Sequence, residues 1–194
     1  MPTLVLLNTW QIVLIGAIVL IAVLILWFVT TYNSLIKLRT AVEEAFSTID
    51  VYLQKRFDMI PNLVETVKGY AAHEKETLES VIRARNLGMS ANTPEEKMAA
   101  SNELSGALSR LMVVVEQYPN LKADSQFMQL MNELSMIEGE IANYRKFYNA
   151  TVKNYNVKIH SIPSNIVANM TGFKPATMFT LPDEAARTAP KVSF

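Results

Sequence analysis

The chain has 194 residues, half of them hydrophobic, and its eighteen basic and eighteen acidic side chains cancel. A neutral chain whose basic residues do not cluster does not favour binding to nucleic acid. The absence of cysteine excludes disulfides and thiolate metal sites, and the scarcity of glycine, with six residues, favours long helices over an all-β fold.

The N-terminal block has the length and composition of a membrane anchor. No charged side chain occurs in the first 36 residues, and within them WQIVLIGAIVLIAVLILWFV runs from Trp10 to Val29. At about 1.5 Å per residue, this stretch spans the roughly 30 Å hydrocarbon core of a bilayer. Trp10 and Trp27 suit the two membrane interfaces. A cleaved signal peptide would have a basic start and a small-residue cleavage site, and neither is present. We therefore expect residues 1–31 to be a transmembrane anchor that contacts the lipid bilayer from Trp10 to Val29.

The orientation of the anchor follows from few charges. Lys37 and Arg39, the first basic residues, come after the span, which favours a cytoplasmic C-terminal domain and an external N-terminus. Glu43 and Glu44 follow closely, so a periplasmic domain is the alternative.

Beyond the anchor, apolar residues recur from Leu35 to Val81 at steps that are almost all three or four. This spacing is typical of one helical face, and it predicts that the membrane helix continues into the first soluble helix without a hinge. Pro61 lies within the stripe, which keeps its spacing through the proline. A kinked continuous helix is therefore favoured over a break, which is the alternative. The first clear loop is expected at residues 86–97, NLGMSANTPEEK.

Two further helices are expected. Thr93, Pro94 and Glu96 form a capping-box start for a helix that ends near Tyr118. After the NLKAD turn, Asp124 is the expected N-cap of a helix over residues 125–159. The sequence thus predicts an all-α fold, in which the membrane helix continues into an antiparallel bundle of three or four long, coiled-coil-like helices. The bundle is expected over residues 32–170, and an irregular tail over residues 171–194.

His73-Glu74 resembles the start of a zinc-binding H-E-x-x-H motif. The stretch reads HEKET, so Thr77 takes the place of the second ligand, and His160 is the only other histidine. Neither histidine belongs to an E-x-x-H pair, which disfavours a di-metal carboxylate site. Nucleophile elbows and glycine-rich phosphate loops are also missing from the sequence. We expect no catalytic residues, no cofactor, no metal and no small-molecule substrate.

The dipeptide Tyr-Asn occurs three times, at Tyr32, Tyr148 and Tyr155. The last two are one heptad apart and lie on the apolar stripe of the last long helix, where each hydroxyl needs a hydrogen-bond partner. A polar network at the edge of the core, which fixes the helix register, is the favoured interpretation. A peptide- or lipid-binding role is the alternative.

Several blocks of the chain resemble the LemA family of bacterial membrane-anchored proteins. The blocks are YNSLIKLR, AFSTIDVYLQKRFDMIPNLVETVKGYAAHE, YPNLKAD, FYNATVKNYN, IPSNIVANMTGF and the final PKVSF. Phe46 stands where the family usually has tryptophan. The resemblance implies an N-terminal membrane helix in the bacterial cytoplasmic (inner) membrane, an antiparallel helical domain and no established enzymatic activity. It also implies links to membrane proteases and to magnetosome-membrane proteins.

These observations favour a non-enzymatic, membrane-anchored scaffold that forms homo-oligomers and organises membrane or envelope partners. An adaptor for a membrane protease or a signalling system, with a membrane protein as its partner, is the alternative. An enzyme is disfavoured, because no catalytic constellation can be assembled from these residues.

Overall fold

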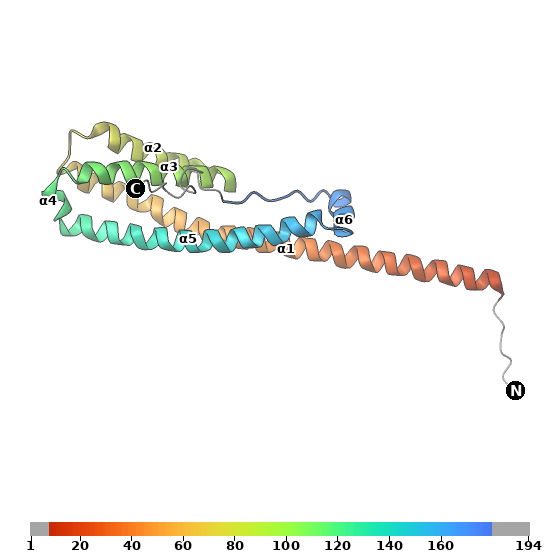
Figure 1. The fold of residues 1–194 in the computed structure, drawn as a ribbon. Coiled ribbons are helices and arrows are strands. Elements are labelled where there is room, and N and C mark those ends of the chain that lie inside the picture. The colour runs from red at the N-terminus through yellow and green to blue at the C-terminus, as the bar shows by residue number, and fades with distance from the viewer. Residues whose placement is uncertain (1–7, 180–194) are drawn as a thin grey trace, which may run out of the picture. The chain divides into compact units, whose positions relative to one another are not determined.

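The computed structural model describes residues 8–179, and between them the chain is helical without any strand (Figure 1). The six helices are α1 (Thr9–Lys68), α2 (Lys75–Ser90), α3 (Pro94–Val115), α4 (Pro119–Lys122), α5 (Ser125–His160) and α6 (Ser164–Thr171). The predicted all-α fold is therefore confirmed. The chain divides into two compact units, which we call the anchor unit (residues 1–41 and 153–176) and the bundle unit (residues 42–152 and 177–194).

Helix α1 runs unbroken through Pro61. The continuous-helix interpretation is confirmed, and the alternative of a break is wrong. The proline is exposed, whereas Ile60, Leu63 and Val64 beside it are almost completely buried. Because these apolar side chains pack into the bundle, their burial offsets the backbone hydrogen bond that a proline removes.

The expectation that the first soluble helix continues past residue 80 is wrong, because α1 ends at Lys68 and a turn over residues 69–74 precedes α2. The N–H groups of Tyr70 and Ala71 both bond to the Val67 carbonyl, at 3.0 and 2.8 Å, which closes the helix end. The side chains of the turn also bond to other elements: Tyr70 donates to Asp124, and Glu74 accepts from Tyr118. The structure places His73 in this turn, where it is exposed.

The predicted loop over residues 86–97 is also largely wrong. Helix α2 continues to Ser90, and only residues 91–93 separate it from α3. Gly88, which suggested a turn in the sequence, is a buried helical residue of α2. A Cβ atom at this position would overlap the ring of Phe57 in α1. Its lack of a side chain therefore permits close helix packing rather than a turn.

The predicted starts of α3 and α5 are confirmed. Thr93 and Glu96 form a complete capping box at the start of α3, with Pro94 as its first residue. The Asp124 carboxylate accepts a hydrogen bond from the Phe127 N–H at 2.8 Å, as an N-cap does. Helix α3 ends at Val115, three residues before the predicted end, and the NLKAD turn contains the short helix α4.

The bundle unit packs the second part of α1 with α2, α3 and most of α5, and α2 lies alongside α3 (Figure 1). The predicted helical bundle is thus confirmed, with four long helices. Its largest fully buried side chains come from α1, α3, α4 and α5, and they include Ile49, Leu53, Phe57, Leu104, Leu111, Leu121, Phe127 and Ile141.

The anchor unit contains the first part of α1, the end of α5 and helix α6. Among the described residues, α1 is the one helix that is long and apolar enough to cross a membrane, and none of its apolar window is buried. Most large apolar side chains from Trp10 to Val29 are exposed, as a bilayer-facing surface requires. The last turns of α5 and helix α6 bury Ile159, Val167 and Ala168.

Candidate functional site

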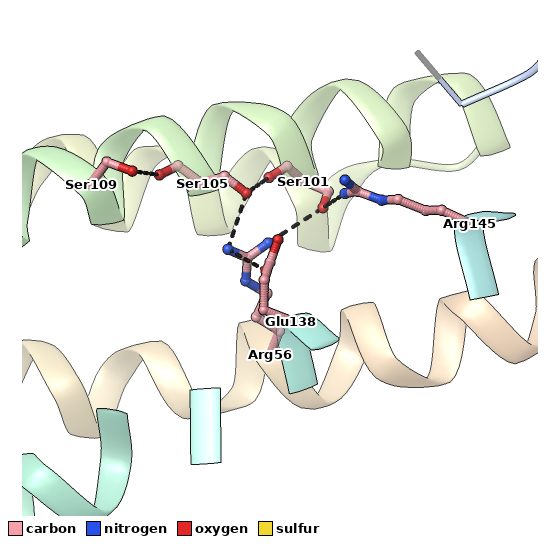
Figure 2. A network of polar contacts seen from close by, with 6 residues as sticks. All are labelled: Arg56, Ser101, Ser105, Ser109, Glu138 and Arg145. Carbon is pink, nitrogen blue, oxygen red and sulfur yellow. Dashed lines mark hydrogen bonds and ion pairs between the residues drawn. The ribbon is translucent and has the colours of Figure 1, made fainter. Parts of the chain in front are cut away.

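The bundle unit contains a buried polar cluster around Arg56 in the second part of α1, which Figure 2 shows from close by. The Arg56 side chain is 4% exposed. Its Nη2 atom donates to Ser105 Oγ at 3.1 Å and lies 2.9 Å from Glu138 Oε2 in α5. Its Nη1 atom makes a longer contact of 3.5 Å with Ser101 Oγ in α3. Arg56 therefore connects three helices through polar contacts.

A second arginine completes the cluster. Arg145 of α5 donates from Nη2 to the fully buried Ser101 Oγ at 2.8 Å, so this hydroxyl lies between two guanidinium groups (Figure 2). The serines themselves are held along α3, because Ser105 donates to the Ser101 carbonyl and Ser109 to the Ser105 carbonyl. These bonds give the cluster one defined geometry.

The cluster carries two positive charges and one negative charge. Burial lowers the pKa of the Arg56 guanidinium, Glu138 raises it in opposition, and the nearby Arg145 lowers it further. The pKa of Arg145 is also lowered, because the effect of burial exceeds the opposing effect of Glu138. Both groups stay charged at neutral pH, because the ordinary arginine pKa lies far above 7. A guanidinium group holds its protons, so neither arginine can act as a general base for Ser101. The arrangement fixes the positions of helices, and neither guanidinium group supplies the proton acceptor that an activated serine needs.

Sequence reasoning named none of these residues. Two signals were present: Arg56 lies at the edge of the apolar stripe of α1, and Ser101, Ser105 and Ser109 recur every four residues on α3. A serine row on one helix and an arginine beside the core of another are suited to a shared buried hydrogen-bond network.

The second feature is a pair of Tyr-Asn clamps, each of which binds the backbone of the C-terminal segment, residues 173–179. In the bundle unit, Tyr148 donates to the Thr177 carbonyl at 2.9 Å. The Asn149 carboxamide pairs with the backbone of Phe179, accepting from its N–H at 2.8 Å and donating to its carbonyl at 2.9 Å. Every group bound on the segment is a main-chain atom.

The clamp in the anchor unit has the same pattern. Tyr155 donates to the Lys174 carbonyl at 3.0 Å. Asn156 accepts from the Ala176 N–H and donates to its carbonyl, both at 2.9 Å. The clamps repeat after seven residues along α5 and after three residues along the segment. Seven helical residues and three extended residues both cover about 10 Å, which explains why a heptad repeat matches an extended chain.

The clamps answer the question that the Tyr-Asn repeat raised. Tyr148 and Tyr155 are each 3% exposed and have hydrogen-bond partners, so the predicted polar network at the core edge is confirmed. The partner is an extended segment of the same chain, however, and not another long helix. The third dipeptide behaves differently: the Tyr32 ring contacts Phe173 edge-on, with centroids 5.8 Å apart.

Phe179 also joins the clamp to the polar cluster. Its ring centroid lies 4.6 Å from the Arg145 guanidinium carbon and 6.0 Å from the centroid of the Tyr148 ring. These distances suit a cation–π contact and an edge-to-face aromatic pair. The site as a whole is therefore a structural centre, in which α1, α3, α5 and the C-terminal segment meet within the bundle unit.

The fold and this centre define a class: helical-bundle proteins with one long apolar N-terminal helix. Residues 45–194 match the model of the LemA family. The chain belongs to the LemA family.

Named relatives agree with this assignment. The chain is 29% identical over 174 residues to magnetosome protein MamQ 2 of Paramagnetospirillum magneticum, across 76% of this chain and 64% of the relative. It is 27% identical over 182 residues to magnetosome protein MamQ of Magnetospirillum gryphiswaldense, across 78% of this chain and 67% of the relative. It is 29% identical over 145 residues to protein LemA of Metamycoplasma hominis, across 73% of this chain and 65% of the relative. The chain thus spans 64% to 67% of the length of these relatives.

The family, these relatives and the apolar helix together indicate a membrane-associated protein. The names of the family and of the relatives are not names of enzymes.

Proposed function

We propose that the chain is a non-enzymatic scaffold in the bacterial inner membrane, which self-associates through its helical bundle and organises membrane or envelope partners. The observation that carries this proposal is the apolar side chains on the outer surface of the bundle. Met136 and Phe147 of α5, which are 65% and 61% exposed, form this surface, whereas Val113 of α3, 68% exposed, lies on another helix and serves below as a control.

Met136 and Phe147 lie on one face of α5. They are eleven residues apart, which at about 100° per residue places them within about 20° of each other around the helix axis. Glu140 and Asn143, both exposed, fall on the same row between them. The buried residues Leu134 and Ile141 point to a different side of the helix. A mixed apolar and polar helix face suits a reversible contact between proteins.

The relatives also support a role in organisation. Two of them are named magnetosome proteins, which is the name of a cellular structure and not of a reaction. The polar cluster supports the non-enzymatic part, because its two guanidinium groups cannot take a proton from Ser101.

The proposed orientation places the N-terminus outside and the bundle in the cytoplasm, because Lys37 and Arg39 follow the apolar span directly. The chain has no cysteine. A single engineered cysteine in the bundle, tested with a membrane-impermeant thiol reagent in intact cells, therefore reports the side of the membrane. Labelling without permeabilising the inner membrane would contradict the proposed orientation.

Self-association is tested by the mass of the full chain in nanodiscs and in mild detergent, for the wild type, Met136→Ser/Phe147→Ser and Val113→Ser. We expect oligomers for the wild type and the Val113→Ser control, and a shift to monomers for the double variant. A wild-type chain that is strictly monomeric at membrane-like densities would overturn self-association.

Crosslinking in cells separates this function from an adaptor. A photoreactive side chain at position 147 should give products at multiples of the chain mass. A single product with a foreign protein would instead favour an adaptor that works with a membrane-protein partner.

A further inference from the structure

The basic and acidic residues of this neutral chain are divided unequally between the two units. The anchor unit contains five basic residues and no acidic residue. The other thirteen basic residues and all eighteen acidic residues belong to the bundle unit. The five anchor-unit residues are Lys37, Arg39, Lys153, Lys158 and Lys174. The anchor unit is therefore the part of the chain whose charge complements an anionic surface.

Helix α6 and the turn before it carry an exposed apolar row. Ile162, Ile166 and Met170 follow one another at intervals of four residues and are 84%, 52% and 72% exposed. The opposite side of α6 is occupied, because Val167 and Ala168 are completely buried. The helix is thus anchored by one face and presents large apolar side chains on the other.

The position of this row within the anchor unit indicates what it faces. Ile162 and Pro163 line an open pocket together with Trp27 and Thr31 of α1. Phe173, just after α6, contacts the Tyr32 ring. These α1 residues lie where the apolar span of Trp10 to Val29 ends, and tryptophan at the end of such a span marks the membrane interface. The start of the exposed row, at Ile162, therefore lies beside the end of the apolar span.

We propose that Ile162, Ile166 and Met170, together with Lys153, Lys158 and Lys174 of the same unit, form an interfacial surface that docks on the anionic leaflet of the bilayer beside the anchor. Apolar side chains on a short helix insert at the boundary between headgroups and acyl chains, and neighbouring lysines bind anionic headgroups. Lys153 and Lys174 are exposed and Lys158 is partly exposed, so all three can reach headgroups.

The bilayer fits this surface better than a second copy of the chain does. A symmetric contact between two such surfaces would bring six lysines together without an acidic residue from either anchor unit. The bilayer is already present here, because the anchor enters it next to the surface. This docking does not depend on self-association of the bundle.

The absence of cysteine permits a direct test in the full chain. Ile166→Cys and Met170→Cys, and Val113→Cys in the bundle unit as the control, are each labelled with an environment-sensitive fluorophore. Each protein is reconstituted at low density into vesicles of phosphatidylcholine alone or with one third phosphatidylglycerol. Quenching is then measured with nitroxide-bearing lipids and with aqueous iodide. A second set carries Lys153→Gln/Lys158→Gln/Lys174→Gln.

We expect the labels at 166 and 170 to be quenched from the lipid and protected from iodide in the anionic vesicles, and the label at 113 to show the reverse. Each lysine removed should weaken insertion roughly five-fold. Unchanged helicity by circular dichroism and an unchanged label at 113 show that the variants are folded.

Three outcomes would overturn the proposal. The first is equal iodide access at 166, 170 and 113 in anionic vesicles. The second is that the labels at 166 and 170 are protected from iodide equally well with and without anionic lipid, and equally well in the lysine variant. The third is that the labels at 166 and 170 become protected from iodide only as the protein density rises, because a second copy of the chain would then occupy the surface.

Discussion

The carboxamide of Asn149 pairs with both backbone groups of Phe179, accepting from the N–H at 2.8 Å and donating to the carbonyl at 2.9 Å. This is the hydrogen-bonding pattern that one strand offers another, here supplied by a side chain of a helix. Because the contact uses only the backbone of residue 179, it holds the chain direction and register of the segment. The Phe179 side chain is left free to stack on Arg145, 4.6 Å away.

Asn149→Ala should release the C-terminal segment from the bundle unit. The variant loses two hydrogen bonds, each with a net contribution of about 0.5–1.5 kcal/mol. We expect amide hydrogen exchange at Phe179 to accelerate roughly tenfold, while exchange in the core of α3 stays unchanged. Asn33→Ala is the matched control, because Asn33 also follows a tyrosine, and it should leave the exchange at Phe179 unaltered. Equal exchange at Phe179 in the wild type and Asn149→Ala would show that the clamp does not hold the segment.

The buried cluster predicts an order of stability for two variants. Glu138→Gln removes the negative charge that Arg56 faces at 2.9 Å and leaves the guanidinium group buried. Breaking a fully buried pair costs about 3–5 kcal/mol, and because the Glu138 side chain is 42% exposed we expect about 1–3 kcal/mol. Arg56→Met removes the buried charge itself, and the freed Glu138 carboxylate can be hydrated.

Chemical denaturation of the two variants measures this order. Arg56→Met should be less destabilised than Glu138→Gln, and the double variant should resemble Arg56→Met alone. If Arg56→Met is more destabilised than Glu138→Gln, the hydrogen bonds of Arg56 to Ser101 and Ser105 contribute more to stability than the ion pair with Glu138. Our account of the cluster would then be wrong.

The sequence predicted the helices better than their ends. The capping box at Thr93 and the N-cap at Asp124 were found because their signals are local. The end of α1 was missed although Gly69 directly follows Lys68, because Val67 and Ala71 continue the apolar spacing. The stripe does lapse between Ala71 and Leu78, across the end of the turn and the first residues of α2. The seven-residue gap in the apolar stripe was therefore a more reliable signal of a helix boundary than the regular spacing on either side of it.

The functional residues were harder to predict, because they depend on contacts between distant segments. Arg56 and Ser101 are 45 residues apart, and Asn149 and Phe179 are 30 apart. The seven-residue repeat of Tyr-Asn was visible, but its partner was an extended segment without any apolar periodicity. A helical pattern predicts which face is buried, and it does not predict which backbone will cover that face.

Two glycines in helices should respond in opposite ways to alanine. At Gly88 a Cβ atom would overlap the Phe57 ring, so Gly88→Ala forces the ring or the helix to move. Overpacking of this kind costs about 1–3 kcal/mol. At Gly139 in α5, nothing lies within 4 Å of the added atom, so Gly139→Ala should stabilise the helix by about 0.5–1 kcal/mol. Thermal unfolding followed by circular dichroism should give a lower midpoint for the first variant and a higher one for the second. A Gly88→Ala protein as stable as Gly139→Ala would show that α2 does not pack closely on Phe57.

The stability of the bundle unit should fall in alkali, and Tyr148 should account for part of the fall. Burial raises the pKa of the Tyr148 hydroxyl from 10.0 to about 12. The unfolded chain therefore loses this proton near pH 10, whereas the folded chain keeps it until near pH 12. The stabilisation is complete below pH 10 and is lost as the pH rises through this window, by about 2 kcal/mol in total.

Tyr148→Phe tests this linkage. At neutral pH the variant should be about 1 kcal/mol less stable, because the Thr177 carbonyl loses its donor. Between pH 10 and 12, however, its stability should fall less steeply than that of the wild type. Some decline should remain, because hydrogen bonds to carboxylates raise the pKa of Tyr70 and Tyr118. Urea denaturation at a series of pH values gives both slopes, and parallel slopes would mean that Tyr148 ionises equally well in the folded and unfolded chains.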